Sequence, residues 1–471
     1  MIKLLIFLIT FFVSFLDKPE KSTPALSERA KEQRAKWNIQ IDQMDYPVST
    51  LYLGQLQKMG VKIHHVSRWF NGATVEMDEQ TAEKVAQLPF VTDVERTRDD
   101  SKSAISARKR QVPNAQITPS SIHARWTDPQ LAVYNLHPLH QAGYEGQGIL
   151  MTVCDGAFKN ADTLSCFRHE QELGHFDFTD DADDFYGYTG AHGTECLSVI
   201  SGIREGFYGA ATKADYYLMR TEEYRTESPK EMDNLVAAFE KADSLGVNIF
   251  SVSLGYAIFD NADWDLDKYT DLDGKSTRVS RAATIAANKG MLVCVAAGNE
   301  GTAEWRTISA PADADSVLTI GAVTTDSVIG NFSSYGPSSD GRVKPEVCAV
   351  GVQATLINPG GVIVNSNGTS FATPLLAGMA AALWSALPDE NAMQIRERII
   401  RSAHMYPNAD KQNQMGYGIP DAWMAYTMNI TENMLLPDAD DHSHVRKIIR
   451  GDQILIIRHG HIYNLAGQMI K

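Results

Sequence analysis

The chain has 471 residues, 44% of them hydrophobic, and a formal net charge of −15. This length allows one large domain with smaller pieces beside it, and the acidic balance argues against nucleic acid as a partner. The five cysteines leave at least one thiol unpaired, and their spacing fits neither a disulfide scaffold nor a zinc site.

The N-terminus predicts a secretory leader. Lys3 is followed by an apolar run from Leu4 to Leu16, which is typical of a signal peptide and short for a membrane span. We therefore expect residues 1–17 to be removed from a secreted protein. An uncleaved membrane anchor is the alternative.

Residues 18–115 are more charged than the region after them and predict a small α+β unit. We expect helices over 51–59 and 79–88, and strands within 61–77 and over 91–96. Asn71-Gly72 is the strongest short signal for a hairpin turn. Further along, Arg108-Lys109-Arg110 is either a processing site or part of a solvated linker.

The next region begins with a strand that ends in a carboxylate. Residues 149–156 form an apolar run that ends in Asp155-Gly156, which is typical of a buried parallel strand. His192 then opens a helix-like stretch, 196–200, after a glycine-containing turn. Taken singly, such an aspartate is more often a turn former, and such a histidine a satisfied polar residue.

Helices and strands alternate after this point. Ser228 to Glu231 is a capping box with proline at the first helical position, and Gly246 ends that helix before a buried strand over 247–254. A helix over 276–288 precedes a strand over 291–297. We therefore predict an α/β fold, a parallel sheet flanked by helices, with sites at the carboxyl ends of its strands.

Two more turns carry polar side chains. The strand over 291–297 runs into Asn299, whose amide can donate to a developing oxyanion or simply serve the turn. Ser370 stands between small residues and a helix-forming segment, 375–386. Small neighbours would let a carbonyl approach this serine, and the N–H groups at the helix start could hold an oxyanion. A turn that caps an ordinary helix is the alternative.

These segments together resemble the subtilisin family of serine peptidases over about residues 141–425. The chain order Asp155, His192, Ser370 is one of the recognised orders of a Ser-His-Asp triad on an α/β fold. Four motifs carry the resemblance: Asp155-Gly156, His192-Gly193-Thr194, Ala296-Ala297-Gly298-Asn299, and Gly368-Thr369-Ser370-Phe371-Ala372-Thr373-Pro374. The first motif departs from the family at Ala157, which leaves the triad intact.

The resemblance implies a secreted serine endopeptidase made as a zymogen. It implies that Ser370 is the nucleophile, that His192 is the general base oriented by Asp155, and that Asn299 and the Ser370 backbone N–H form the oxyanion hole. Two segments match the substrate-binding walls of the family: Ser253, Leu254 and Gly255, and Ala296, Ala297 and Gly298.

The resemblance also implies partners and a location. Residues 18–115, and 51–94 above all, resemble the inhibitory prodomains of Bacteroidetes subtilisin-like peptidases. Expected partners are thus protein or peptide substrates and the chain's own prodomain, with no nucleic acid and no membrane span once the leader is removed. The protein would cross a bacterial periplasm. The chemistry needs no cofactor, and structural calcium, common in the family, has no mappable ligand set in the acidic stretch 177–184.

These inferences divide the chain into four parts: a signal peptide (1–17), an inhibitory prodomain and linker (18–115), a peptidase domain (116–430), and a linker and C-terminal hairpin (431–471). The expected hairpin strands, 454–457 and 462–465, resemble the sorting signals of type IX exported proteins of Bacteroidetes. An edge hairpin of the catalytic domain is the alternative.

Two other functions remain open. The first is a catalytically silent peptide-binding protein on the same fold. The second is a narrow processing protease for basic sites. This enzyme would need acidic residues around its pocket, and Glu300 is the candidate that the sequence offers.

Overall fold

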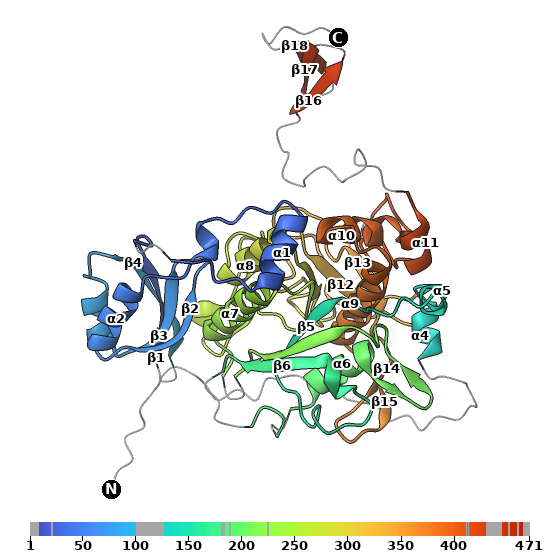
Figure 1. The fold of residues 1–471 in the computed structure, drawn as a ribbon, viewed down its shortest axis with the longest axis horizontal. Helices are drawn as coiled ribbons and strands as arrows, with labels where there is room; N and C mark the ends of the chain where they lie inside the picture. The colour runs from blue at the N-terminus through green and yellow to red at the C-terminus, as the bar shows by residue number, and fades with distance from the viewer. Residues whose placement is uncertain are drawn as a thin grey trace. The chain divides into compact units, whose positions relative to one another are not determined.

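The computed structural model describes most of the chain (Figure 1). The described residues are 9–19, 22–99, 127–179, 184–187, 190–223, 226–410, 412 and 414–429, and the backbone of 445–450, 453–458 and 461–464. The predicted processing site at Arg108-Lys109-Arg110 lies outside them.

The first part of the chain forms a four-stranded antiparallel sheet and several short helices, of which α1 packs on α7 of the larger part. In order across the sheet, the strands are β2 (Lys62–Ser67), β3 (Gly72–Glu76), β1 (Ile9–Phe15) and β4 (Val91–Asp99). The helices are α1 (Glu28–Lys36), the short η1 (Gln43–Asp45), α2 (Thr50–Lys58) and α3 (Glu79–Val85). The predicted hairpin is present, with Asn71 at a positive φ of 45° between β2 and β3.

Strand β1 includes residues that the sequence placed in the leader. The residues expected in a signal peptide are hydrogen-bonded to β3 on one side and β4 on the other, so cleavage after residue 17 would split the sheet. Both faces of β1 are covered: Val13 packs in the core of the small unit, and the Arg278 guanidinium lies 3.8 Å from the Phe12 ring centre. A strand covered on both faces is apolar throughout, as a leader is.

The larger part of the chain is built on a seven-stranded parallel sheet (Figure 1). In order across the sheet, its strands are β13 (Val347–Val350), β12 (Leu318–Val323), β11 (Leu292–Ala296), β10 (Ile249–Val252), β5 (Leu150–Asp155), β9 (Asp215–Arg220) and β6 (Glu172–Asp177). The predicted α/β fold class is therefore confirmed.

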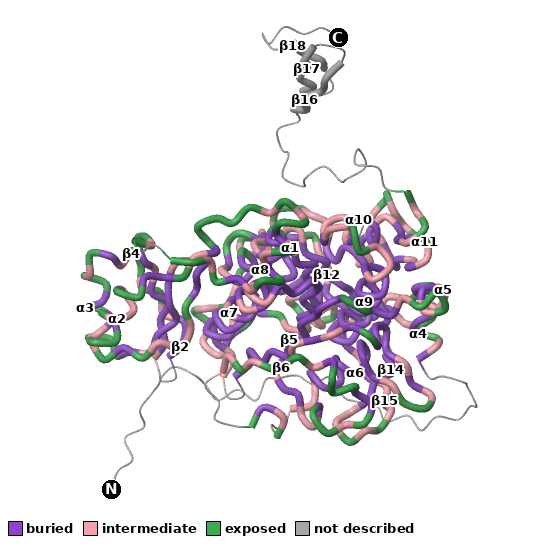
Figure 2. The backbone as a smooth tube through the Cα atoms, viewed as in Figure 1, coloured by how far each residue is buried: buried purple, intermediate pink, exposed green. Residues whose placement is uncertain are grey.

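Helices cover both faces of this sheet. The helices on one face are α6 (His192–Ser201), α9 (Thr369–Ala386) and α10 (Ala392–Arg401), and those on the other are α7 (Pro229–Leu245) and α8 (Arg278–Asn288). Alternate residues of β5 divide between the two cores: Met151 and Val153 pack with α6 and α9, and Leu150 and Cys154 with α7 and α8. Figure 2 shows the buried backbone concentrated along these layers.

Helix α7 begins and ends where the sequence predicts, whereas α9 begins earlier than predicted. Helix α7 starts and stops as expected, with a capping box at Ser228 and Gly246 in the left-handed region, φ 75°. Helix α9 begins at Thr369, earlier than the predicted 375. Ser370 consequently lies in the first turn of α9, where backbone N–H groups lack intrahelical partners.

Buried charges join the small sheet to α7. Arg68, just after β2, pairs with Glu240 and Asp243, and Arg34 of α1 pairs with Asp243 and with Asp45. All five side chains are buried, so each needs its partner across the contact. The two sheets belong to one compact unit that extends to Met428.

The remaining helices and strands of the described residues are short. They are α4 (Asp128–Ala132), α5 (His137–Gln141), η2 (His169–Gln171), β7 (Ile203–Arg204), β8 (Phe207–Tyr208), η3 (Ala262–Trp264), β14 (Ala354–Ile357), β15 (Ile363–Ser366) and α11 (Ala422–Thr427). No helix among the described residues has the length and apolarity to cross a bilayer.

The tail is a separate unit, residues 429–471. It contains a three-stranded antiparallel sheet of β16 (Val445–Arg450), β17 (Gln453–Arg458) and β18 (His461–Asn464). Strands β17 and β18 were expected from the sequence, whereas β16 was not. The charged residues Arg446, Lys447 and Arg450 interrupt the apolar pattern of β16.

Candidate active site

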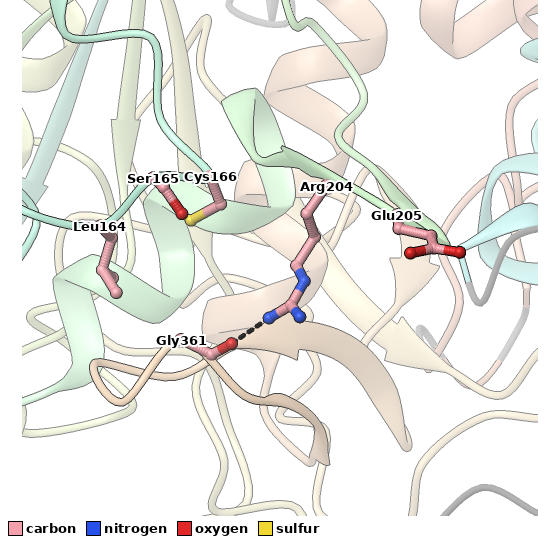
Figure 3. Close-up of a pocket in the computed structure, with 6 residues that line it drawn as sticks. All are labelled: Leu164, Ser165, Cys166, Arg204, Glu205 and Gly361. Carbon is pink, nitrogen blue, oxygen red and sulfur yellow. Dashed lines mark hydrogen bonds between the residues drawn. The ribbon is translucent and has the colours of Figure 1, made fainter.

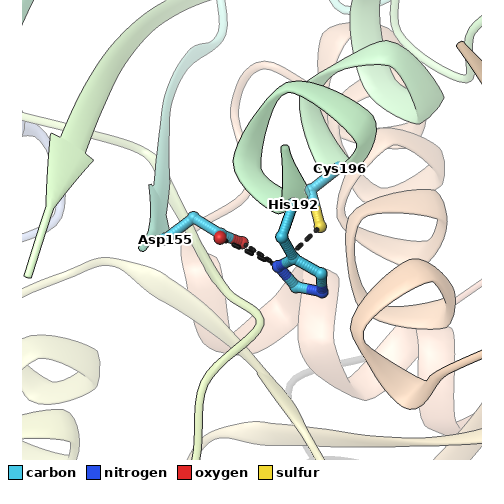
Figure 4. A group of neighbouring side chains, drawn as sticks. All are labelled: Asp155, His192 and Cys196. Atoms are coloured by element: carbon cyan, nitrogen blue, oxygen red, sulfur yellow. Dashed lines mark hydrogen bonds and ion pairs between the residues drawn. The ribbon is translucent and has the colours of Figure 1, made fainter. Parts of the chain in front are cut away.

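The first pair of site residues meets at the carboxyl end of β5. Asp155 is the last residue of β5 and His192 the first of α6. Nδ1 of His192 lies 2.8 and 2.9 Å from the two carboxylate oxygens of Asp155 (Figure 4). Gly193 permits this approach, because a Cβ there would lie 2.5 Å from the Ala157 carbonyl oxygen. The carboxylate holds the ring by Nδ1, which leaves Nε2 for chemistry.

Electrostatics at this pair favour a charged imidazole. Partial burial would lower the pKa of His192, but the negative charge of Asp155 and the hydrogen bond to it raise that pKa well above its ordinary value. Asp155 is almost wholly buried, at 1% exposed, and accepts a backbone hydrogen bond from Gly156. An imidazolium formed by proton transfer would therefore be stabilised here.

Cys196 lies one helical turn beyond His192 (Figure 4). Its sulfur is 3.9 Å from His192 Nδ1, and its thiol donates to the Ser370 carbonyl at 3.3 Å. Burial raises the pKa of this thiol to about 11, so it is neutral at ordinary pH. Cys196 thus packs between the histidine and the serine-bearing turn as a neutral group.

Ser370 reaches the same region from α9. The hydroxyl of Ser253 donates to the Ser370 carbonyl at 2.7 Å, and the ring of Phe371 lies 5.4 Å from that of His192, centre to centre. The structure gives no hydrogen bond between the described side chains of His192 and Ser370. Such bonds are often long until substrate binds. Gly368 leaves the serine room, since a Cβ there would lie 2.7 Å from Ser370 Oγ.

Asn299 follows β11 and is held by the residue before the serine. Its side-chain oxygen accepts from the Thr369 backbone N–H at 2.9 Å and from the Thr369 hydroxyl at 3.1 Å. These bonds orient the oxygen toward α9 and leave the amide Nδ2 as the outward donor. The sequence motif contained Thr369 but did not assign this role to it. The position of Thr369 directly before Ser370 was the sequence feature that could have indicated this role.

The two predicted substrate-binding segments lie side by side. Residues 253–255 come directly after β10, and residues 296–298 lie at the end of β11. The two strands are paired, with Val252 opposite Val295.

The carboxylate of Glu300 is hydrogen-bonded and is not a free charge beside these segments. Its carboxylate accepts from the Asn299 backbone N–H at 2.7 Å and from the Ser334 hydroxyl at 3.3 Å.

Two other features lie away from these residues. A pocket of about 230 Å³ is lined by Leu164, Ser165, Cys166, Arg204, Glu205 and Gly361 (Figure 3), none of them a predicted site residue.

In the acidic stretch 177–184, Asp177 pairs with Arg220, and 180–183 lie outside the described residues. The calcium prediction therefore stays a prediction.

Comparison with known proteins gives two family matches. Residues 132–418 match the subtilase family, peptidase S8, and residues 10–114 match the peptidase S8 propeptide domain of Bacteroidota. The second match begins inside β1, in agreement with its place in the small sheet.

Individual proteins resemble the chain over most of its length. Subtilisin NAT from Bacillus subtilis subsp. natto is 24% identical over 357 residues, 75% of this chain and 81% of that protein. A subtilisin from Bacillus pumilus is 27% identical over 56% of this chain and 87% of its own. The crystal structure of MycP1 from Mycobacterium smegmatis shares the fold, with a TM-score of 0.53 and 21% identity over 70% of this chain and 92% of that one.

Proposed function

The chain belongs to the subtilase family of serine endopeptidases, and on this premise we propose that it hydrolyses peptide bonds through Asp155, His192 and Ser370. The contact of His192 Nδ1 with both oxygens of Asp155, at 2.8 and 2.9 Å, carries the proposal. It fixes the tautomer that makes Nε2 a base.

Each residue has a role in the proposed reaction. Ser370 Oγ attacks the peptide carbonyl as His192 Nε2 takes its proton, and the oxyanion receives hydrogen bonds from Asn299 Nδ2 and the Ser370 N–H. His192 returns the proton to the leaving amine, and an acyl-enzyme remains. Water, activated by the same histidine, releases the acid. No cofactor enters this sequence.

The proposal includes inhibition by the first domain. A propeptide match over residues 10–114 implies a zymogen, and strand β4 of the small sheet contacts α7 and pairs with Glu223 through Arg98. The buried ion pairs of Arg34 and Arg68 support tight docking. Added separately, residues 9–110 should inhibit the mature enzyme. Absence of inhibition at micromolar concentration would contradict this part.

Export is also proposed, with passage through a periplasm and release or display at the cell surface. Export rests on the resemblance to exported Bacteroidetes peptidases. The predicted leader is not used as support, because residues 9–15 form a strand of the prodomain. Fractionation of native cells tests it: activity confined to the cytoplasm would contradict export.

Ser370→Ala is the test of the reaction. Wild-type protein should hydrolyse peptides and be labelled by a fluorophosphonate at Ser370, and the variant should fold, remain unlabelled and persist as the precursor. A silent peptide-binding protein would show neither turnover nor labelling. Equal turnover by the variant would contradict the assignment of the nucleophile.

A further inference from the structure

The stretch between β1 and α2 leaves the small sheet and packs on the peptidase domain. We call residues 22–46, which include α1 and η1, the strap. In Figure 1, α1 lies apart from the strands of the small sheet, and it contacts α7. Lys18 closes the strap at its base. Its Nζ donates to the backbone carbonyls of Gln43, Tyr46 and Arg68 at 2.6, 2.7 and 2.7 Å, which ties the strap to the end of β2.

The first half of the strap covers the C-terminal end of α7. The Ser27 backbone N–H donates to the Ser244 carbonyl at 2.8 Å. The Arg29 guanidinium donates to the Gly246 carbonyl at 3.0 Å and to Asn248 Oδ1 at 2.7 Å. The last carbonyls of a helix have no partner within the helix, and they favour a positive charge. The strap therefore caps a helix of the other domain.

The second half of the strap covers the C-terminal end of α8. Lys289, which follows α8, pairs with Asp42 at 2.8 Å and with Asp45 at 3.0 Å. Both Lys289 and Asp45 are buried, so the loss of either partner would leave a poorly compensated charge. The next residue, Gly290, lies directly under the strap, because a Cβ there would be 2.9 Å from Ile39 Cδ1.

The strap lies at the edge of the large sheet that is opposite the candidate active site. Asn248 comes directly before β10, and its Oδ1 also accepts from the Leu150 N–H at the start of β5. Asp155 is at the other end of β5, about 16 Å away at the usual rise per residue of a strand. A substrate bound at the carboxyl ends of the strands therefore does not compete with the strap.

We infer that the strap is a second anchor of the prodomain, independent of the active site, and that it sets how slowly a cleaved prodomain leaves the enzyme. While the strap is bound, the small sheet stays beside α7 and rebinds readily, and the reverse also holds. A cut between residues 99 and 127 breaks none of these contacts. The inference concerns the regulation of the proposed peptidase and rests on that function.

The test uses the full-length Ser370→Ala protein with a recognition sequence for a site-specific protease inserted between residues 110 and 116. The protein is attached to a surface by its C-terminus, labelled at its N-terminus, cut and washed. Loss of the label then gives the dissociation rate of the prodomain. Arg29→Ala and Lys289→Gln should each raise this rate about tenfold, because each removes charge-assisted hydrogen bonds of the strap.

Lys31→Ala is the matched control, since Lys31 lies on the same helix as Arg29 but pairs with Glu28 of that helix. It should keep the parent rate. One test change lies in the prodomain and the other in the peptidase, so misfolding of one domain cannot produce both effects. Parent rates in both Arg29→Ala and Lys289→Gln would overturn the inference.

A second measurement connects the strap to activation. In the protein that keeps Ser370, peptidase activity should appear about tenfold sooner after the cut with Arg29→Ala than with Lys31→Ala. The released enzymes are identical in sequence, so a difference in the lag reports release of the prodomain. Equal lags would contradict the inference. Absence of any activity would instead contradict the proposed function, and the dissociation rates of the Ser370→Ala protein would still decide whether the strap is an anchor.

Discussion

Acid should loosen the contact between prodomain and peptidase through His65 of β2. Its Nε2 lies 2.8 Å from the Phe178 carbonyl oxygen and 3.0 Å from Asn234 Oδ1, both in the peptidase domain. Burial, and then the positive charge of Lys230, lower the pKa of His65 to about 4. The contact therefore accepts the neutral ring and resists the charged one.

The size of the effect follows from linkage. An exposed histidine has a pKa of about 6.5, so the buried environment, which lowers the pKa of His65 to about 4, favours the neutral form. The stabilisation is fully present above about pH 6.5 and is lost as the pH falls toward 4. At about pH 5 the loss is roughly 2 kcal/mol, and well below pH 4 it reaches roughly 3 kcal/mol.

The assay is the free energy of unfolding of the full-length Ser370→Ala protein, measured with denaturant at about pH 7.5 and about pH 5. His65→Gln keeps an N–H donor for both acceptors but cannot titrate, so it should lose roughly 2 kcal/mol less over this interval. His64→Gln is the control, because His64 contacts Glu76 within the prodomain. If the parent and His65→Gln lose the same stability, the reasoning is refuted.

Three further outcomes are expected. Asn299→Ala should lower kcat by about 10²–10³ with little change in KM, since the amide acts in the transition state; a change confined to KM would make it a binding residue. A mercurial should inhibit by displacing His192 from Cys196, and unchanged sensitivity of Cys196→Ala would point instead to another thiol such as Cys154. Val13→Asp should unfold the prodomain sheet, because it buries an unpaired carboxylate in β1. Limited proteolysis of the full-length Ser370→Ala protein would show this, with the exposed Leu16→Asp as the control, and a silent Val13→Asp would mean that β1 is dispensable.

The local pattern of the chain was enough to predict the main fold. Helix α7 carries its own start and stop signals in Ser228 and Gly246, and continuous apolar runs gave the buried strands. Parallel strands bring their carboxyl ends to one edge of a sheet. Asp155 and Asn299 could therefore be expected together from their positions at the ends of two such runs.

Local pattern could not say what covers an apolar run. Residues 9–15 have the composition of a leader, and only the pairing with β3 and β4 identifies them as a strand. The same limit applied to the start of α9. A Gly-Thr-Ser turn before a helix and a first helical turn look alike until the contact of Thr369 with Asn299 is known.

What the sequence determined by itself was the set of residues proposed for the chemistry: an aspartate, a histidine, an asparagine and a serine, each next to a glycine or close to one. What the tertiary structure decided was which charges meet. Arg98 and Glu223 are far apart in the chain and are joined because the small sheet docks on α7. Contacts of this kind depend on the packing of whole surfaces, and no spacing of residue types along the chain encodes them.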